Sequence, residues 1–218
     1  IIDINFCRKN NIKLCNLQNY ASTSVAEHVF TLTLNLIKQI KGLENDINTE
    51  IWQQKKVFAL LDRSIEDLSG KTIGIIGKGA IGKQVAKISK AFNMKVNFFS
   101  VRDYKRSNFK KFLSNCDILT IHCPLENNTI NLISINELKL MKKSSIIINT
   151  ARGGIINEKD LVNALRKKLI AGAGIDVATT EPPKKNHPYY SIIDNPNFIW
   201  TPHTAWASNA TLNNAVNQ

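Results

Sequence analysis

The sequence predicts an α/β protein built on a doubly wound parallel sheet. From residue 71 onward, short runs rich in isoleucine and valine alternate with segments of helical periodicity, as in successive βαβ units. Most of these runs are continuously apolar, which is typical of strands buried on both faces of a parallel sheet. A glycine-rich stretch at 77–82 joins the first run to the helical segment that follows it.

The elements are expected in the following order. Residues 1–21 form an irregular lead-in. Residues 22–41 predict a long helix, in which Ser24 and Glu27 fit an S-x-x-E capping box. Residues 42–70 are polar and ambiguous, although we expect Trp52 and the apolar run 57–61 to pack against other parts of the chain. Strands are expected at 71–77, 95–100, 117–125, 144–151, 170–177 and 197–202, and helices at 80–92, 107–115, 134–142 and 157–168.

Composition bounds the class of protein. The chain has 218 residues, of which 43% are hydrophobic and 21% charged, enough for one large globular domain or slightly more. The net charge of +12 and the isoelectric point of 9.6 invite a nucleic-acid interpretation. However, the lysines are scattered over helical segments, and neither a zinc-finger spacing nor an aromatic RNA-binding motif is found. We therefore expect no nucleic-acid partner.

The sequence shows no membrane span and no export signal. The apolar run at 29–37 is too short to cross a bilayer, and Asp3 and Asn5 interrupt the first apolar residues. Because the chain begins at Ile1 and ends at Gln218 without a helix stop, we expect a piece of a longer protein. The cysteines show no C-x-x-C spacing and predict reduced thiols in a cytoplasmic protein, not a metal site: Cys7, Cys15, Cys116 and Cys123.

The glycine-rich stretch fits a dinucleotide site of the Rossmann type. Gly77, Gly79 and Gly82 form G-x-G-x-x-G between a predicted strand and a predicted helix, the context that this motif requires. The first glycine permits a tight turn, the second lets a pyrophosphate approach the backbone, and the third lets helix and strand pack closely. Free N–H groups at the helix start, at Ala80 and Ile81, then receive the phosphates. The structural alternative is a set of glycines that serve only the turn.

The end of the second expected strand bears on the choice between NAD and NADP. An acidic residue is expected there to bind the ribose hydroxyls of NAD, but the position holds Ser100, and Arg102 follows. Arg102 can pair with the 2′-phosphate of NADP, which favours NADP(H) or use of both cofactors. In the alternative interpretation, Arg102 is a solvated loop charge, and Ser100 and the backbone hold the ribose.

Three polar residues follow three expected strands at one edge of the sheet: Arg152, Glu181 and His203. Singly, each has an ordinary structural explanation, as a helix cap, a loop carboxylate or a turn histidine. Together, beside a dinucleotide, they fit the reduction of a 2-oxo acid. Arg152 can bind the carboxylate and polarise the carbonyl, and His203 can supply the proton that the carbonyl oxygen needs. Glu181 is expected to orient the imidazole and favour its protonated form.

These motifs resemble the D-isomer-specific 2-hydroxyacid dehydrogenase family. The resemblance rests on the glycine loop, on the order Arg152, Glu181, His203, and on the segments IHCPL (121–125), NTARGGIINEKDL (149–161), GAGIDVATTEPP (172–183) and TPHTAWAS (201–208). It implies hydride transfer between a nicotinamide dinucleotide and C2 of a D-2-hydroxy or 2-oxo acid, with no metal. The segment AWAS at 205–208 is similar to glycerate dehydrogenases, also called hydroxypyruvate reductases.

The resemblance also implies further cofactor contacts. Cys123 and Pro124 would line the nicotinamide side of the site. Thr150 and Ala151 would contact the cofactor beside Arg152, with His203 facing it. Asp176 would hold the nicotinamide carboxamide.

By the same resemblance, residues 1–22 would end a truncated substrate-binding domain, 23–203 would form the Rossmann domain, and 204–218 would begin a returning C-terminal helix. A homodimer is implied, with the helix after Ser24 as the expected contact. Two other interpretations stay open. One is a dinucleotide-sensing, corepressor-like binding protein on the same scaffold. The other is an unrelated Rossmann enzyme of the adenosylhomocysteine hydrolase type, which leaves 151–154 and 201–203 unexplained.

Overall fold

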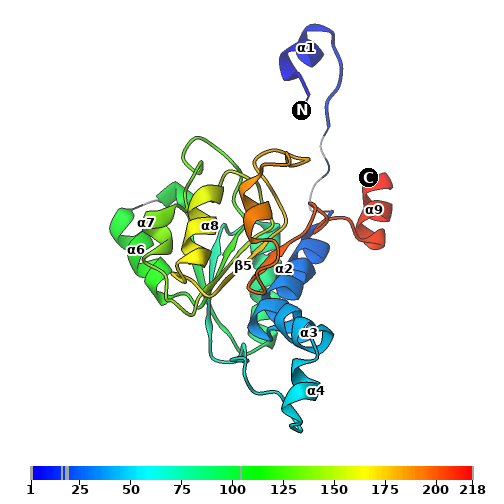
Figure 1. Cartoon of the computed structure of the whole chain (residues 1–218). Helices are drawn as coiled ribbons and strands as arrows, with labels where there is room; N and C mark the ends of the chain where they lie inside the picture. The colour runs from blue at the N-terminus through cyan, green and yellow to red at the C-terminus, as the bar shows by residue number, and fades with distance from the viewer. Residues whose placement is uncertain (1, 16, 18–19, 104, 218) are drawn as a thin grey trace.

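The computed structural model describes residues 2–15, 17, 20–103 and 105–217, and Figure 1 shows the chain. A six-stranded sheet of order β2-β1-β3-β4-β5-β6 forms its centre, and every neighbouring pair of strands is parallel. This confirms the predicted doubly wound α/β fold. The strands are β1 (Thr72–Ile76), β2 (Lys95–Phe99), β3 (Ile118–Ile121), β4 (Ile146–Asn149), β5 (Gly172–Ile175) and β6 (Phe198–Trp200).

Helices cover both faces of the sheet (Figure 1). α2 and α5 pack together on one face, and α6, α7 and α8 cover the other. Two hydrophobic clusters result, one between the sheet and α2 and α5, the other between the sheet and α6, α7 and α8. Along β4, Ile146 and Ile148 belong to the cluster under α2 and α5 and Ile147 to the other, because successive side chains of a strand point to opposite faces. The helices are α1 (Ile4–Lys9), α2 (Ser22–Ile37), α3 (Ile40–Asn48), α4 (Ile51–Lys55), α5 (Ala80–Ala91), α6 (Arg106–Asn115), α7 (Ile135–Leu138), α8 (Glu158–Arg166) and α9 (Asn209–Val216), with short 3₁₀ turns η1 (Val101–Asp103) and η2 (Pro188–Ile192).

The chain reverses its direction of travel across the sheet between β1 and β3. β2 lies on one side of β1, and β3 lies on the other. The loops after these three strands therefore meet, and the backbone N–H of Gly77 donates to the carbonyl of Phe99 at 3.0 Å, while that of His122 donates to Ile76 at 2.7 Å. In doubly wound sheets, ligands bind where the strand order reverses, in the crevice at the carboxyl ends of the strands.

The strands are shorter than the apolar runs predicted. β3 ends at Ile121, which pairs with Ile76 and Asn149, so residues 122–125 leave the sheet. β4 likewise ends at Asn149 and β5 at Ile175. The polar residues that follow these strands are thus released at the carboxyl edge of the sheet.

Two expectations about the N-terminal part are wrong. The lead-in contains α1, and the capping box at Ser24 does not form, because α2 already begins at Ser22 after Ala21. Ser24 lies inside the helix, and its hydroxyl donates to the carbonyl of Ala205 at 2.7 Å. α2 ends at Ile37, where Lys38 and a left-handed Gln39 (φ 57°) separate it from α3.

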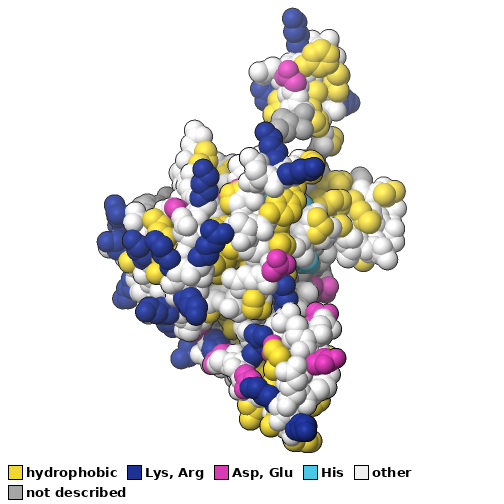
Figure 2. Space-filling model, viewed as in Figure 1, with side chains coloured by type: hydrophobic (Ala, Val, Ile, Leu, Met, Phe, Trp, Pro, Cys, Tyr) yellow, Lys and Arg dark blue, Asp and Glu magenta, His cyan; other side chains and the backbone are white. Residues whose placement is uncertain are grey.

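The expected packing of the segment after α3 is also wrong. Trp52 is 43% exposed, Leu61 84% and Phe58 99%. α3 and α4 project from the body of the fold in Figure 1, and apolar surface is visible at that end in Figure 2.

Within the residues that the structure describes, no helix is long and apolar enough to span a membrane.

Candidate active site

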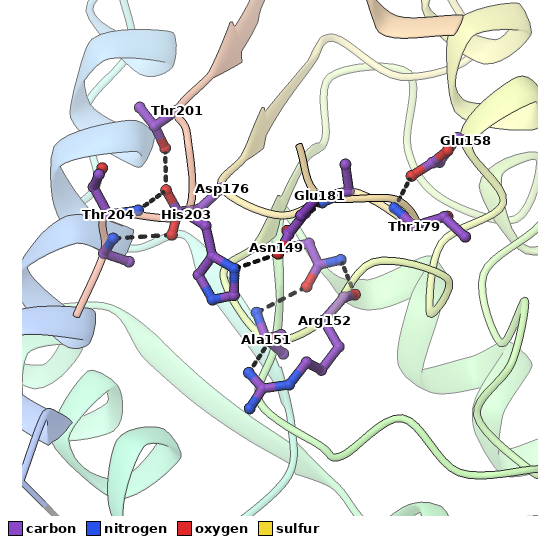
Figure 3. Close-up of polar contacts among 12 residues, drawn as sticks. Asn149, Ala151, Arg152, Glu158, Asp176, Thr179, Glu181, Thr201, His203 and Thr204 are labelled. Atoms are coloured by element: carbon purple, nitrogen blue, oxygen red, sulfur yellow. Dashed lines mark hydrogen bonds and ion pairs between the residues drawn. The ribbon is translucent and has the colours of Figure 1, made fainter. Parts of the chain in front are cut away.

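A histidine and a glutamate meet at the carboxyl edge of the sheet. His203 follows β6 and Glu181 lies in the loop after β5; Nδ1 of His203 is 2.6 Å from Oε2 of Glu181 (Figure 3). Both side chains are 35% exposed. The other oxygen of Glu181 accepts from the backbone N–H of Ala178 at 2.8 Å, which fixes the carboxylate. Because Nδ1 is engaged, Nε2 is the nitrogen left to exchange a proton with a ligand.

The backbone at His203 is held in an unusual conformation by Asp176. The φ angle of His203 is 56°, in the left-handed region, which costs a non-glycine residue about 1–3 kcal/mol. Its N–H donates to the carbonyl of Asp176 at 2.8 Å. The Asp176 carboxylate accepts from the backbone N–H groups of Thr204 (3.0 Å) and Ala205 (2.9 Å) and from the hydroxyl of Thr201 (2.5 Å). The buried Asp176 therefore fixes the turn that presents His203.

Arg152 stands at the tip of β4 on a turn shaped by Asn149. The Asn149 side chain accepts from the N–H of Ala151 and donates to the carbonyl of Arg152, both at 3.0 Å. The Arg152 guanidinium is exposed and donates to the carbonyl of Ala151 at 2.6 Å. Among the described residues no acidic side chain forms an ion pair with it. Its charge is open to an anion, on the side toward which the His203 ring points (Figure 3).

One cavity of about 620 Å³ collects most of the predicted residues: Ile81, Cys123, Pro124, Thr150, Ala151, Arg152, Asp176 and His203. Glu181 lines a neighbouring cavity of about 450 Å³, which shares His203 and Asp176 with the first. His203 thus stands between its carboxylate partner and the larger space. A cavity of about 970 Å³ opens at the amino ends of the strands, beside Lys71 and Asp117, and contains none of the predicted residues. Volume alone therefore does not mark the site.

The glycine loop leaves space at one of its three glycines. Gly77 has φ 104°, and a Cβ there would lie 2.5 Å from the carbonyl oxygen of His122. A Cβ at Gly82 would strike the carbonyl of Gly77. At Gly79, where φ is −73°, a Cβ would meet nothing within 4 Å. The fold itself needs the first and third glycines, whereas the open space at Gly79, before Ala80 at the start of α5, suits the close approach of a pyrophosphate.

Two buried polar atoms at residues lining the Arg152 cavity have no hydrogen-bond partner among the described residues, His122 Nδ1 and Thr150 Oγ1. His122 Nε2 lies 2.9 Å from the hydroxyl of Thr120, and burial lowers the pKa of His122 to about 3. Burial raises the pKa of the Cys123 thiol to about 11, so both groups are neutral near pH 7. Unpaired buried polar atoms beside a cavity suit a polar ligand. Together with the space at Gly79, they fit a nicotinamide dinucleotide.

Ser100 and Arg102 lie after β2, beside the glycine loop. Both side chains are exposed, and neither lines the Arg152 cavity. The hydrogen bond from Gly77 to Phe99 holds the ends of β1 and β2 together, so these two residues lie next to the turn of the loop.

Sequence reasoning missed several residues around the site. Tyr20 and Trp206 line the Arg152 cavity, with ring centroids 6.5 Å apart. Nε2 of His28 on α2 lies 3.0 Å from the hydroxyl of Thr201 and 3.6 Å from Oδ1 of Asp176. Burial lowers the pKa of His28, although the negative charge of Asp176 acts in the opposite direction. Asn149 alone had a usable signal, because it is a polar residue at the carboxyl end of an isoleucine run.

The chain is similar to known proteins over most of its length. Residues 30–205 match the model of the D-isomer specific 2-hydroxyacid dehydrogenase, NAD binding domain. A glycerate dehydrogenase from Methylorubrum extorquens is 40% identical over 97% of this chain and 68% of its own length. A hydroxypyruvate reductase from Blautia hydrogenotrophica is 31% identical over 95% of this chain and 66% of its own. The crystal structure of D-lactate dehydrogenase with NAD⁺ from Lactobacillus jensenii has a TM-score of 0.85 and 29% identity, covering 99% of this chain and 69% of that one.

Proposed function

Since the chain belongs to the D-isomer-specific 2-hydroxyacid dehydrogenase family, we propose that it transfers a hydride between a nicotinamide dinucleotide and C2 of a D-2-hydroxy or 2-oxo acid. The observation that carries the proposal is the His203–Glu181 pair beside an Arg152 that no described acid neutralises. We propose glycerate and hydroxypyruvate as the substrate pair, which the similarity to the two relatives supports.

In reduction, Arg152 would bind the substrate carboxylate through parallel N–H donors and polarise the adjacent carbonyl. The bound nicotinamide supplies the hydride in this direction and accepts it in the other. Nε2 of His203 would donate a proton to the carbonyl oxygen, which leaves a neutral imidazole with Nδ1–H on Glu181. In oxidation the neutral His203 would take the proton from the substrate hydroxyl.

We assign the cofactor contacts by position. Gly79 and the N–H groups of Ala80 and Ile81 would receive the pyrophosphate, with Gly77 and Gly82 shaping the loop. Asp176 would accept from the carboxamide with the remaining lone pairs of its carboxylate. The exposed Ser100 and Arg102 favour NADP(H) or use of both cofactors. The residues assigned to the nicotinamide side are Cys123, Pro124, Thr150 and Ala151.

The domain assignment and the oligomer are also proposals. Residues 23–203 would form the cofactor domain, and 1–22 and 204–218 would belong to a substrate-binding domain; α1 and α9 both project from the body in Figure 1. We propose a homodimer. The expected contact is α2, and the exposed apolar side chains of 52–65 offer further contact surface. The free thiols of all four cysteines support a cytoplasmic location.

The test is to mix the full-length protein with hydroxypyruvate, glyoxylate or pyruvate and to follow nicotinamide absorbance with NADH and NADPH in parallel. We expect rapid oxidation with hydroxypyruvate, and the faster cofactor identifies the role of Ser100 and Arg102. Tight dinucleotide binding without oxidation by any of the three acids would contradict the proposal and favour a dinucleotide-sensing protein.

A further inference from the structure

A second histidine–carboxylate pair lies next to the loop that carries Glu181. Glu158 is the first residue of α8, and His187 immediately precedes η2. Nε2 of His187 is 2.9 Å from Oε2 of Glu158, and the two side chains are only 6% and 12% exposed. Neither residue lines the Arg152 cavity, so the pair has no place in the reaction described above.

The surroundings of His187 define the state of this pair. Nδ1 of His187 accepts from the backbone N–H of Tyr189 at 3.3 Å, so Nε2 is the protonated nitrogen, and it lies beside Glu158. The contact has the distance of an ion pair without the alignment of a good hydrogen bond. The imidazole stacks on Trp200 of β6, with ring centroids 5.2 Å apart. Burial, and then the charge of Glu158, raises the pKa of Tyr189.

The second oxygen of Glu158 reaches the Glu181 loop itself. Oε1 of Glu158 accepts from the backbone N–H of Thr179 at 2.7 Å (Figure 3). The preceding residue, Ala178, donates its N–H to Glu181. From the other side, Gly153 packs so closely that a Cβ there would strike the carbonyl of Ala178. The loop is therefore clamped between α8 and the turn after Arg152, one residue from the amide that orients Glu181.

We propose that Glu158 and His187 are positioning residues, which hold residues 178–181 so that the Glu181 carboxylate is aimed at Nδ1 of His203. Glu158 joins α8 to the loop, and His187 fixes the rotamer of Glu158 from the β6 side. The consequence for catalysis rests on the proposed function, because it acts through His203. The hydrogen-bond geometry does not depend on that function.

The test substitutes Glu158→Gln in the full-length protein. The amide keeps one oxygen for Thr179 but turns its NH₂ toward the Nε2–H of His187, donor against donor. We expect kcat for hydroxypyruvate reduction to fall about tenfold to a hundredfold, by analogy with the loss of groups that orient metal ligands. KM should stay within about twofold, because Arg152 still binds the substrate carboxylate.

Asp160→Asn is the matched control. Asp160 lies in the same first turn of α8, and its Oδ2 accepts from the backbone N–H of Ile135 on α7 at 2.9 Å, away from the loop. This variant loses the same charge at the same helix end, so we expect a comparable loss of stability with kcat unchanged. If Glu158→Gln and Asp160→Asn give equal kcat, the positioning role is refuted.

A second variant, His187→Phe, keeps a ring to stack on Trp200 but removes the contact with Glu158. We expect it to lower kcat as Glu158→Gln does, and the double variant to be no slower than the slower single one, because the two residues act as a unit. If the losses of kcat in the two single variants add up in the double variant, the two residues do not act as a unit.

Amide hydrogen exchange separates this proposal from the proposed function. In Glu158→Gln we expect faster exchange at Ala178 and Thr179 than in Asp160→Asn. If the wild-type protein reduces no 2-oxo acid, the proposed function fails, and the exchange rates alone decide the positioning role. Equal rates at Ala178 in the two variants would overturn it.

Discussion

At the scale of single residues, the site depends on which nitrogen of each imidazole is already occupied. Glu181 holds Nδ1 of His203, which leaves Nε2 for chemistry. At His187, Nδ1 accepts from the N–H of Tyr189, and Nε2 lies 2.9 Å from the Glu158 carboxylate. His122 uses Nε2 on Thr120, and its buried Nδ1 has no described partner. The roles that we propose for these three histidines, as proton donor, positioning group and neutral polar contact, therefore differ because their neighbours differ.

Replacing His203 with Asn should remove the proton donor without disturbing the cofactor site. We expect kcat to fall by about 10²–10⁴, the usual contribution of a general acid. The dissociation constant of the dinucleotide, measured by fluorescence titration, should stay close to the wild-type value. Turnover at the wild-type rate would exclude His203 from the mechanism.

His122 should make stability depend on pH. Burial lowers its pKa to about 3 in the folded protein, whereas a histidine in the unfolded chain titrates near 6.5. The unfolded chain therefore binds the proton first, and the free energy of unfolding should fall by about 1 kcal/mol between pH 7 and pH 5.5. Urea unfolding should show this loss in the wild type and a smaller one in His122→Gln. The same pH dependence in both proteins would contradict the assignment.

At the scale of elements, the three glycines before and at the start of α5 differ in the space around them. Two of these glycines are required by the packing of the fold, and one leaves room for a ligand. Gly77 and Gly82 have protein atoms where a Cβ would stand, and Gly79 does not. The motif predicts the same division of roles among the three glycines, and the space around each of them fits it.

Substitution of these glycines by alanine should therefore give two different outcomes. Gly82→Ala forces a Cβ onto the carbonyl of Gly77 and should lower the free energy of unfolding by about 1–3 kcal/mol. Gly79→Ala should keep wild-type stability and weaken dinucleotide binding about tenfold to a hundredfold, because the methyl group occupies space left for the ligand. Thermal unfolding and calorimetric titration measure the two effects. A Gly79→Ala variant that binds as tightly as the wild type would refute the phosphate assignment.

At the scale of the whole molecule, apolar surface remains outside the two hydrophobic clusters. Phe58, Leu61 and Trp52 are exposed on α4 and in the segment that follows it. Figure 2 shows apolar surface at that end of the molecule. Several large apolar side chains exposed on one short segment favour an interaction site there. A second copy of the chain would cover it without any further partner.

The dimer prediction is tested by Phe58→Asp. Placing a charge at the contact should raise the dissociation constant of the dimer at least about tenfold, as loss of an aromatic anchor does. Val216→Asp is the control, because Val216 is also strongly exposed, at 86%, but lies on α9. Sedimentation equilibrium should show more monomer for the first variant only. An unchanged dimer would move the interface away from this segment.

The sequence by itself determined the sheet and the strands that the candidate site residues follow. Strand and helix periodicity are local, so the six strands were found, and Arg152, Glu181 and His203 were placed at strand ends because parallel strands end at one edge. The ends of the elements were predicted less well than their existence, because pairing with neighbouring strands decides where a strand ends. The strand expected at 117–125, for example, ends at Ile121.

Only the tertiary structure decided which atoms meet. Ser24 was expected to cap a helix, yet its hydroxyl donates to the carbonyl of Ala205, 181 positions along the chain, and Phe58 and Leu61 of the apolar run 57–61 are exposed. The use of Asp176 to fix the His203 turn also arises from contacts between segments far apart in sequence. Local sequence patterns do not predict such contacts, because these contacts form only when the folded sheet brings its loops together at one edge.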